Sequence, residues 1–157
     1  MDIYKKYIAT TGIKKDNSQL KVITEFSKLQ SQLEVNHLDR SFFRNLFQTK
    51  KMIKGIYLWG NVGRGKTFLM DLFFNTLKTK RKRRLHFHQM MNDIHTNLVQ
   101  LKQAKDPIKK LTRLMKKDID VLCFDEFFVE DIADAMILHK FLEGLFEEGI
   151  TLVATSN

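Results

Sequence analysis

Gly60-Asn61-Val62-Gly63-Arg64-Gly65-Lys66-Thr67 is the stretch of sequence that decides the fold. It fits the pattern G-x-x-x-x-G-K-[S/T] and joins a short apolar run, Gly55 to Trp59, to a helical stretch, Thr67 to Leu77. The backbone N–H groups of such a loop, together with the positive end of the helix that follows, surround an anion. The order of strand, glycine-rich loop and helix therefore predicts a phosphate-binding loop.

The residue types in this loop suit a nucleotide and its magnesium ion. The glycines let the backbone curl toward phosphate oxygens, Lys66 brings a positive charge to the β and γ phosphates, and the hydroxyl of Thr67 is a ligand for Mg²⁺. We therefore expect ATP and Mg²⁺ as cofactors. The expected cofactor-binding residues are Gly60, Asn61, Val62, Gly63, Arg64, Gly65, Lys66 and Thr67. The alternative, a glycine-rich turn that contains Lys-Thr by chance, fits the two flanks poorly.

A second half-site follows the apolar strand Val121 to Phe124, which ends in two adjacent carboxylates. Asp125 is expected to hold Mg²⁺, usually through water, and Glu126 to orient and polarise the attacking water. This is the Walker B pattern. Seen alone, it is also compatible with a strand that ends in an acidic turn. Beside a phosphate-binding loop it predicts ATP hydrolysis.

The tripeptide Thr155-Ser156-Asn157 follows another apolar strand, Ile150 to Thr155. The amide of Asn157 is able to bridge the attacking water and the γ-phosphate, and this placement resembles the sensor 1 position of AAA+ ATPases. In that fold the sensor strand lies between the strands that carry the two motifs. The tripeptide by itself is equally compatible with a surface turn.

The remaining elements alternate along the chain and predict an α/β fold with a parallel sheet covered on both faces. We expect a helix that begins after Asp16, a connector or short helix at 39–47, and a basic, solvated connection at 78–84. Further along we expect a strand at 85–88, helices at 89–102 and after Asp106-Pro107, a strand at 119–124, and a helix from Asp131 to Gly149. The expected division is a helical N-terminal segment, residues 1–54, and a nucleotide-binding core, residues 55–157.

Composition narrows the class of protein. The chain has 157 residues, is 43% hydrophobic and contains one Cys, which fits a single domain without disulfides. No apolar run is long enough to cross a bilayer and the N-terminus lacks the features of a leader, so we expect a cytoplasmic protein. The net charge of +9 comes mostly from Lys rather than Arg, and the last 39 residues are acidic. Nucleic-acid binding is therefore not expected.

The segments around these motifs resemble the ZapE-type AAA+ ATPases, bacterial cell-division proteins with mitochondrial relatives. The most specific segment is Leu122 to Val129 with its continuation Asp131-Ile132 and Asp134 to Met136, which generic AAA+ proteins lack. The other matching segments are Gly55–Gly60, Val62–Thr67, Leu69–Phe73, Arg84–His88 and Gly149–Asn157. The resemblance covers most of the chain from residue 55.

The resemblance implies a P-loop NTPase of the AAA+ class, a three-layer sandwich. It also implies a homo-oligomeric ring that hydrolyses ATP and acts on FtsZ, or on another division protein, at the septum. Members of the family continue beyond sensor 1 with a fifth strand, an arginine finger and a helical lid, whereas this chain stops at Asn157. We therefore expect a core that is incomplete at the C-terminus, with the strand Ile56 to Trp59 at an apolar edge.

Two other functions stay open. One is a catalytically silent nucleotide-binding or interaction module, and the other is a DNA-associated protein that resembles helicase loaders. A histidine metal site is a weaker possibility: His86 and His88 are expected to alternate on one strand and His95 to follow on a helix, but no Cys or carboxylate cluster completes a ligand set. Met90, Met91 and Cys123 are expected to be packing residues.

Overall fold

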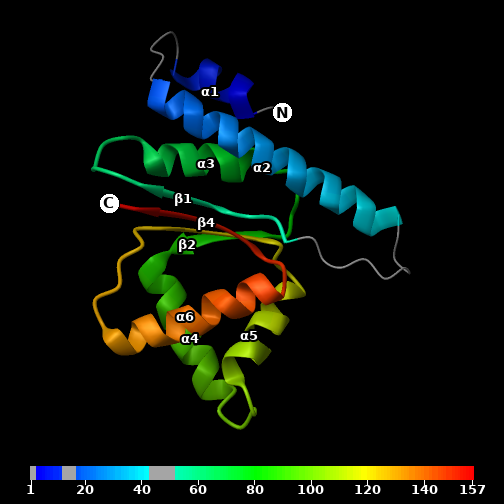
Figure 1. The fold of residues 1–157 in the computed structure, drawn as a ribbon, viewed down its shortest axis with the longest axis vertical. Coiled ribbons are helices and arrows are strands. Elements are labelled where there is room, and N and C mark those ends of the chain that lie inside the picture. The colour runs from blue at the N-terminus through cyan, green and yellow to red at the C-terminus, as the bar shows by residue number, and fades with distance from the viewer. Residues whose placement is uncertain (1–2, 12–16, 43–51) are drawn as a thin grey trace.

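The computed structural model describes residues 3–11, 17–42 and 52–157, which form a parallel sheet between two groups of helices (Figure 1). The elements in chain order are α1 (Ile3–Thr11), α2 (Asn17–Phe42), β1 (Ile56–Trp59), α3 (Lys66–Thr76), β2 (Lys82–His86), α4 (Phe87–Gln100), α5 (Pro107–Lys116), β3 (Val121–Asp125), α6 (Ile132–Glu147) and β4 (Thr151–Ser156). The predicted connector at 39–47 falls partly on α2 and otherwise outside the described residues. No described helix is long and apolar enough to cross a membrane.

The four strands are all parallel and follow the order β1-β4-β3-β2. Strand β4 thus lies between the strand that precedes the glycine-rich loop and the strand that ends at Asp125, as expected of a sensor strand. Among the described residues, β1 and β2 form the two edges of the sheet. The carboxyl ends of parallel strands meet at one edge, and this is where ligands of open α/β sheets bind.

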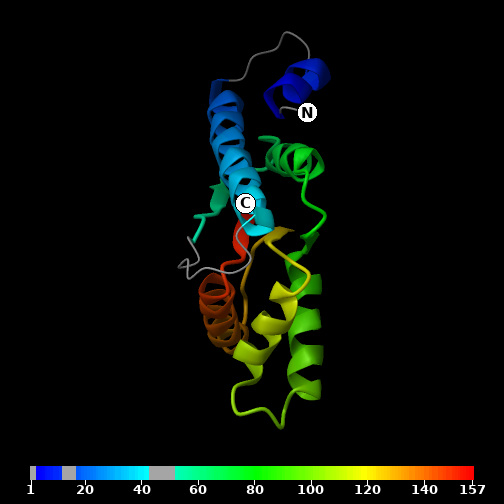
Figure 2. The same cartoon turned by 90° about the vertical axis from the view of Figure 1, so that its right-hand side faces the viewer.

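Side chains of β3 alternate between two hydrophobic cores, because successive residues of a strand point to opposite faces. Val121 and Cys123 belong to the core shared with α1, α2 and α3. Leu122 and Phe124 belong to the core shared with α4, α5 and α6. Burial on both faces explains why the strand is apolar from Val121 to Phe124, and Figures 1 and 2 show the helices on either side.

The first helical layer is built on α2 and α3. Phe26 of α2 stacks on Phe73 of α3 with ring centroids 4.6 Å apart, and both side chains are fully buried. Helix α1 was not expected from the sequence; it buries Ile3 and Tyr7, four residues apart on one face. The N-terminal helices therefore share a core with the sheet. The division of the chain at residue 54 stays a prediction.

The second layer confirms the predicted helix ends. Asp106 accepts a hydrogen bond of 3.0 Å from the N–H of Lys109, with Pro107 at the first helical position of α5. Asp131 likewise accepts a bond of 2.7 Å from the N–H of Ala133 at the start of α6. Gly149, with φ 69°, reverses the chain after that helix. These caps satisfy backbone groups that the helices cannot pair themselves.

The prediction for residues 78–88 was wrong in part. Strand β2 begins at Lys82, within the supposed solvated connection, and ends at His86, while Phe87 and His88 start α4. The cations are accommodated because β2 is an edge strand and they find partners: Lys82 Nζ donates to the carbonyl oxygens of Phe74 (2.6 Å) and Leu77 (2.7 Å). His86 and His88 therefore do not alternate on one strand.

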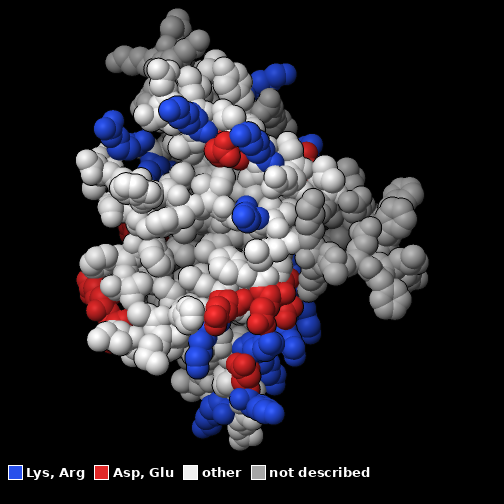
Figure 3. Space-filling model, in the orientation of Figure 1, with Lys and Arg blue, Asp and Glu red and all other residues white. Residues whose placement is uncertain are grey.

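In the fold, acidic residues of the C-terminal part of the chain lie beside basic residues of the middle part. Figure 3 shows acidic side chains gathered beside basic ones over α5 and α6. Ion pairs join Lys109 to Glu147 at 2.8 Å and Arg113 to Glu148 at 3.4 Å. The acidic C-terminal part of the chain thus packs against part of its basic middle.

Candidate nucleotide-binding site

The glycine-rich loop takes a backbone shape that depends on glycine. Gly60, Gly63 and Gly65 have φ values of 146°, 81° and 75°, a region that side chains with a Cβ rarely enter. Gly65 is also the residue that caps α3, and its carbonyl accepts the first helical bond from Leu69 N–H at 2.9 Å. The loop therefore passes directly into the N-terminal end of a helix, where backbone N–H groups are available to an anion.

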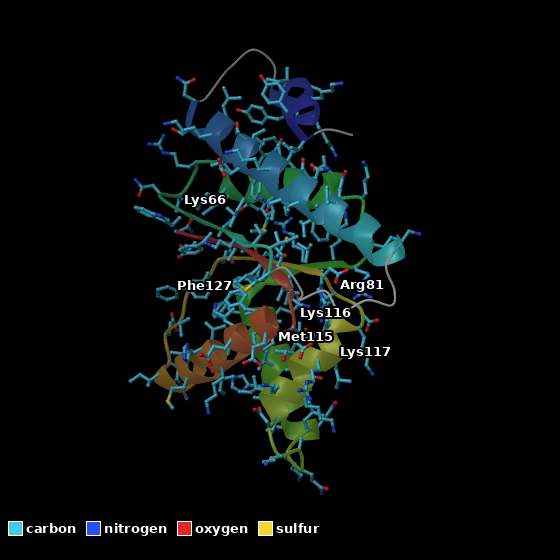
Figure 4. The ribbon with its side chains drawn as sticks, turned by 45° about the vertical axis from the view of Figure 1, so that its right-hand side comes forward. Lys66, Arg81, Met115, Lys116, Lys117 and Phe127 are labelled. Atoms are coloured by element: carbon cyan, nitrogen blue, oxygen red, sulfur yellow. The ribbon has the colours of Figure 1, made fainter. Side chains whose placement is uncertain are left out.

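Lys66 lies across this loop. Its Nζ donates to the carbonyl oxygens of Gly60 at 2.6 Å and Asn61 at 2.9 Å. Residues 61–64 and Thr67 are exposed, so the surface of the loop is open to a ligand. Figure 4 shows Lys66 toward the same end of the sheet as Phe127, and Arg81 and Lys116 toward the opposite end. The ammonium group of Lys66 is thus held against the loop by two backbone carbonyl oxygens.

Asp125 presents a buried carboxylate at the carboxyl end of β3. Its residue is 3% exposed, and its Oδ2 accepts a hydrogen bond of 2.9 Å from Nη2 of Arg84. The other oxygen, Oδ1, lies 2.6 Å from Nδ1 of His86, but no hydrogen bond of acceptable alignment reaches it. His86 is the direct neighbour of Asp125 in the ladder between β2 and β3.

Glu126 follows in a strained backbone conformation. Its φ of 56° makes it the only residue other than glycine with a positive φ in the described part of the chain. Such a conformation costs on the order of 1–3 kcal/mol and persists when the surroundings enforce it. The Glu126 side chain is exposed, with Oε2 3.9 Å from Nδ1 of His86. The backbone therefore turns this carboxylate out of the sheet, away from the buried direction of Asp125.

Phe127 holds the turn in place. Its ring contacts Phe87, Phe124 and Tyr57 with centroids 5.0, 5.7 and 6.0 Å away. Its N–H donates to the carbonyl oxygen of Thr155 at 2.8 Å, which joins the segment after β3 to β4. Anchored on both sides, the segment has little freedom to let Glu126 relax.

Asn157 comes directly after β4, at the edge of the sheet from which Asp125 and Glu126 extend. Phe124 pairs with Ala154, so the two strands end side by side. The preceding residue, Ser156, has its Oγ 2.6 Å from the hydroxyl of Tyr57 on β1. The structure thus brings the expected residues of the loop, of β3 and of β4 to one edge, while their catalytic and binding roles stay predictions.

The oxygen atoms at this edge fit a magnesium ion. Mg²⁺ prefers oxygen ligands and retains several waters, so one or two protein groups suffice when a phosphate is bound. Oδ1 of Asp125 is a buried carboxylate oxygen without a hydrogen bond, and Thr67 carries an exposed hydroxyl. In residues 3–11, 17–42 and 52–157 no group of three or more His, Cys, Asp or Glu is able to hold a metal by itself. His95 instead contacts Asp134, with Nε2 2.7 Å from Oδ1.

Sequence reasoning missed three residues of this site. Arg84 contacts Asp125 and also forms an ion pair with Asp71 of α3, and His86 lies beside Asp125. Arg84 and His86 are in a segment that the family resemblance singled out, as is Asp71, but no local pattern ties them to Asp125. Their contacts join residues far apart in sequence, which spacing alone does not predict.

Comparison with known proteins agrees with this geometry. The family model described as AFG1-like ATPase matches residues 1–157. The chain is 54% identical over 105 residues to "Cell division protein ZapE" of Escherichia coli (strain K12), an alignment that covers 67% of this chain and 28% of that protein. It is 45% identical over 115 residues to "Lactation elevated protein 1 homolog B" of Danio rerio, covering 66% of this chain and 23% of that protein.

A solved structure supports the fold independently. The crystal structure of DnaI matches with a TM-score of 0.57 at 18% sequence identity, covering 92% of this chain and 69% of that chain. At that identity the likeness concerns the fold alone. The alignments with the two curated relatives span only about a quarter of their lengths.

Proposed function

The chain belongs to the AFG1-like ATPase family, and from this membership we propose that it binds ATP with Mg²⁺ and takes part in ATP hydrolysis. The observation that carries the proposal is the meeting of three features at one edge of the sheet: the glycine-rich loop with Lys66, the buried Asp125, and the exposed Glu126. Phosphoryl transfer to water requires three groups: a loop that binds the phosphates, a ligand that holds the metal, and a carboxylate that orients the water.

Each residue has a defined task in this proposal. The loop N–H groups bind phosphate oxygens, and Lys66 exchanges the carbonyl oxygens of Gly60 and Asn61 for the β and γ phosphates. Thr67 and Asp125 would hold Mg²⁺, which supplies neutralisation of the phosphate charge. Glu126 orients a water molecule and accepts its proton as the water attacks the γ-phosphorus. Asn157 positions that water through its amide.

We further propose that the protein acts in cell division in the cytoplasm, as part of a homo-oligomeric ring, with FtsZ or another division protein as its partner. The support is the relation to a protein named for cell division and the family resemblance of the segment after Asp125. The partner and the ring are tested by co-purification and by mass measurement of the assembly in the presence of ATP.

The nucleotide proposal is tested by titration with ATP. Trp59 is the only Trp of the chain, precedes the loop directly and is 79% exposed, so its fluorescence reports on binding. Lys66→Ala is expected to lose binding, and Glu126→Gln to retain ATP and lose turnover. Lys140→Ala, which removes an exposed lysine of α6, serves as the control and is expected to bind ATP like the parent chain.

The alternatives predict different results. Binding of ATP without turnover in a concentrated solution would reject hydrolysis and support a silent nucleotide-binding module. Affinity for single-stranded DNA that falls steeply with salt would support the helicase-loader alternative. Equal turnover in Glu126→Gln and the parent chain would reject the role of Glu126.

A further inference from the structure

We propose that Arg84 is a positioning residue that joins the two halves of the metal site, by holding Asp125 of β3 and, through Asp71, the first turns of α3. The inference rests on the proposed function, since it concerns the Mg²⁺ that accompanies ATP. It adds to that function a residue on a third element, the edge strand β2, that determines how the two metal ligands lie.

The first contact is with Asp125. The Arg84 side chain is 22% exposed and that of Asp125 is 4% exposed, so the pair is largely removed from water. Burial of a carboxylate is costly unless it has a hydrogen-bonded partner, and the guanidinium of Arg84 at 2.9 Å from Oδ2 is such a partner. The contact also fixes the rotation of the carboxylate, because one oxygen is engaged. Oδ1 lies 2.6 Å from Nδ1 of His86 but accepts no aligned hydrogen bond, so it is the oxygen that we expect to serve a metal-bound water or a metal.

The second contact is with Asp71. Nη1 of Arg84 forms an ion pair with Oδ1 of Asp71, while Nη2 serves Asp125. Asp71 lies four residues after Thr67 on α3, so the two side chains project from the same face of the helix, one turn apart. Because both residues belong to one helix, a contact that fixes Asp71 also contributes to fixing Thr67. One guanidinium thus links the helix of one metal ligand to the strand of the other.

The chemistry of arginine suits this task. Its planar fork carries separate N–H groups in fixed directions, so two carboxylates on different elements are held at a defined separation. A lysine has a single flexible ammonium and cannot define that separation in the same way. Groups that orient metal-ligating carboxylates commonly affect metal affinity without touching the metal. Arg84 is expected to act in this manner.

The test measures how strongly Mg²⁺ improves ATP binding. ATP is titrated into the full chain in EDTA and at a series of free Mg²⁺ concentrations, with Trp59 fluorescence as the signal. Arg84→Ala is expected to lower the apparent Mg²⁺ affinity of the ATP complex by roughly ten- to hundred-fold. Its ATP binding in EDTA is expected to match that of the parent, because the loop and Lys66 are unchanged. A residue with only a structural role would alter both titrations together.

The neighbouring arginine provides a matched control. Arg83 lies on the same strand, and its Nη2 pairs with Oδ2 of Asp93 on α4 at 2.5 Å, outside the candidate site. Arg83→Ala removes the same charge and is expected to leave the Mg²⁺ dependence unchanged. A shift as large as that of Arg84→Ala would show that net charge alone is responsible and would overturn the proposal.

A substitution of Asp71 provides a second test of the proposal. Asp71→Asn preserves shape at a side chain that is 42% exposed, so the fold is retained even if Arg84→Ala is unstable. It is expected to weaken Mg²⁺ affinity in the same direction, and this effect is expected to vanish in the Arg84→Ala background, since the two residues act as one unit. A folded Asp71→Asn variant with parental Mg²⁺ dependence would reject the link.

The same titrations distinguish a failure of the proposed function from a failure of the positioning role of Arg84. A parent chain that binds no ATP in the presence of Mg²⁺ rejects the proposed function. A parent that binds ATP with Mg²⁺, together with an Arg84→Ala variant of unchanged Mg²⁺ dependence, rejects only the positioning role of Arg84.

Discussion

The backbone N–H of Phe127 donates a hydrogen bond of 2.8 Å to the carbonyl oxygen of Thr155, which ties the turn after β3 to the neighbouring strand β4. Glu126 precedes this anchor and has a φ of 56°. The bond thus helps to hold a carboxylate in a conformation that it would not adopt in a flexible loop.

Replacement of Glu126 by Gly is expected to stabilise the fold while abolishing ATP turnover. Glycine removes about 1–2 kcal/mol of backbone strain at positive φ in the folded state. Part of this gain is offset because glycine also raises the conformational entropy of the unfolded chain. We therefore expect a gain of up to about 1 kcal/mol in urea unfolding. Glu130→Gly, in the same loop but at a negative φ, is the control and is expected to be neutral or destabilising. A loss of stability in Glu126→Gly would contradict the assigned strain.

Removal of the Phe127 ring is expected to destabilise the protein and loosen the site. The ring contacts three other aromatic side chains, so Phe127→Ala is expected to cost about 2–3 kcal/mol, below the full value for a buried Phe because Phe127 is only half-buried. Phe128 is its neighbour and is 61% exposed. Phe128→Ala is expected to stay within about 0.5 kcal/mol of the parent in the same chemical denaturation. Equal costs for the two variants would refute the anchoring role.

The pair of Arg81 and Asp120 is expected to stabilise the fold without affecting the nucleotide. Nε of Arg81 lies 2.7 Å from Oδ2 of Asp120, and Nζ of Lys116 lies 2.7 Å from Oδ1 of the same carboxylate. Arg81 and Lys116 lie at the end of the sheet opposite Lys66 (Figure 4). Arg81→Ala is expected to cost about 2 kcal/mol, since Asp120 is nearly buried while Arg81 is partly exposed.

The measurement for this variant combines thermal unfolding with ATP titration. Affinity for ATP in the folded protein is expected to equal that of the parent. Lys80→Ala removes the exposed cation directly before Arg81, between α3 and β2, and is the control for the loss of charge. An altered affinity for ATP in Arg81→Ala, with Lys80→Ala unchanged, would indicate a coupling between the two ends of the sheet.

The thiol of Cys123 is expected to make stability fall in alkaline solution. Burial raises its pKa to about 12 from the ordinary 9.0, against the opposing influence of Arg84 and Lys82. The folded protein therefore keeps the proton that the unfolded chain releases above pH 9. The contribution of the protonated thiol to the free energy of unfolding is complete below pH 9. It is lost as the pH rises toward 12, at about 1.4 kcal/mol per pH unit.

Urea unfolding of the parent and of Cys123→Ala at several pH values tests this. The variant is expected to be less stable at pH 7, because it leaves a cavity in the core, but to lose less stability between pH 9 and pH 11. Because the two chains share every other titrating group, their difference isolates the thiol. Parallel pH profiles would argue against the raised pKa.

Much of the fold was predictable because its signals are local. The loop from Gly60 to Thr67 needs positive φ values at its glycines and a helix directly after it. Consecutive residues of the sequence indicate both features. The caps at Asp106 and Asp131 depend on a side chain and a backbone group within three residues of each other. The start of β2 was missed because Lys82 and its neighbours are strongly polar, and only pairing with β3 and the carbonyl oxygens at the end of α3 accommodate them.

The sequence by itself determined which residues are proposed to carry the chemistry of this protein: a glycine-rich loop of the phosphate-binding pattern and, more than 50 residues later, two adjacent carboxylates at the end of an apolar strand. Only the tertiary structure decided how these groups are held. The link from Asp71 through Arg84 to Asp125 joins α3, β2 and β3, and the anchor of Phe127 joins the end of β3 to β4. Such contacts arise because a parallel sheet brings the ends of strands distant in sequence to one edge, which no local pattern encodes.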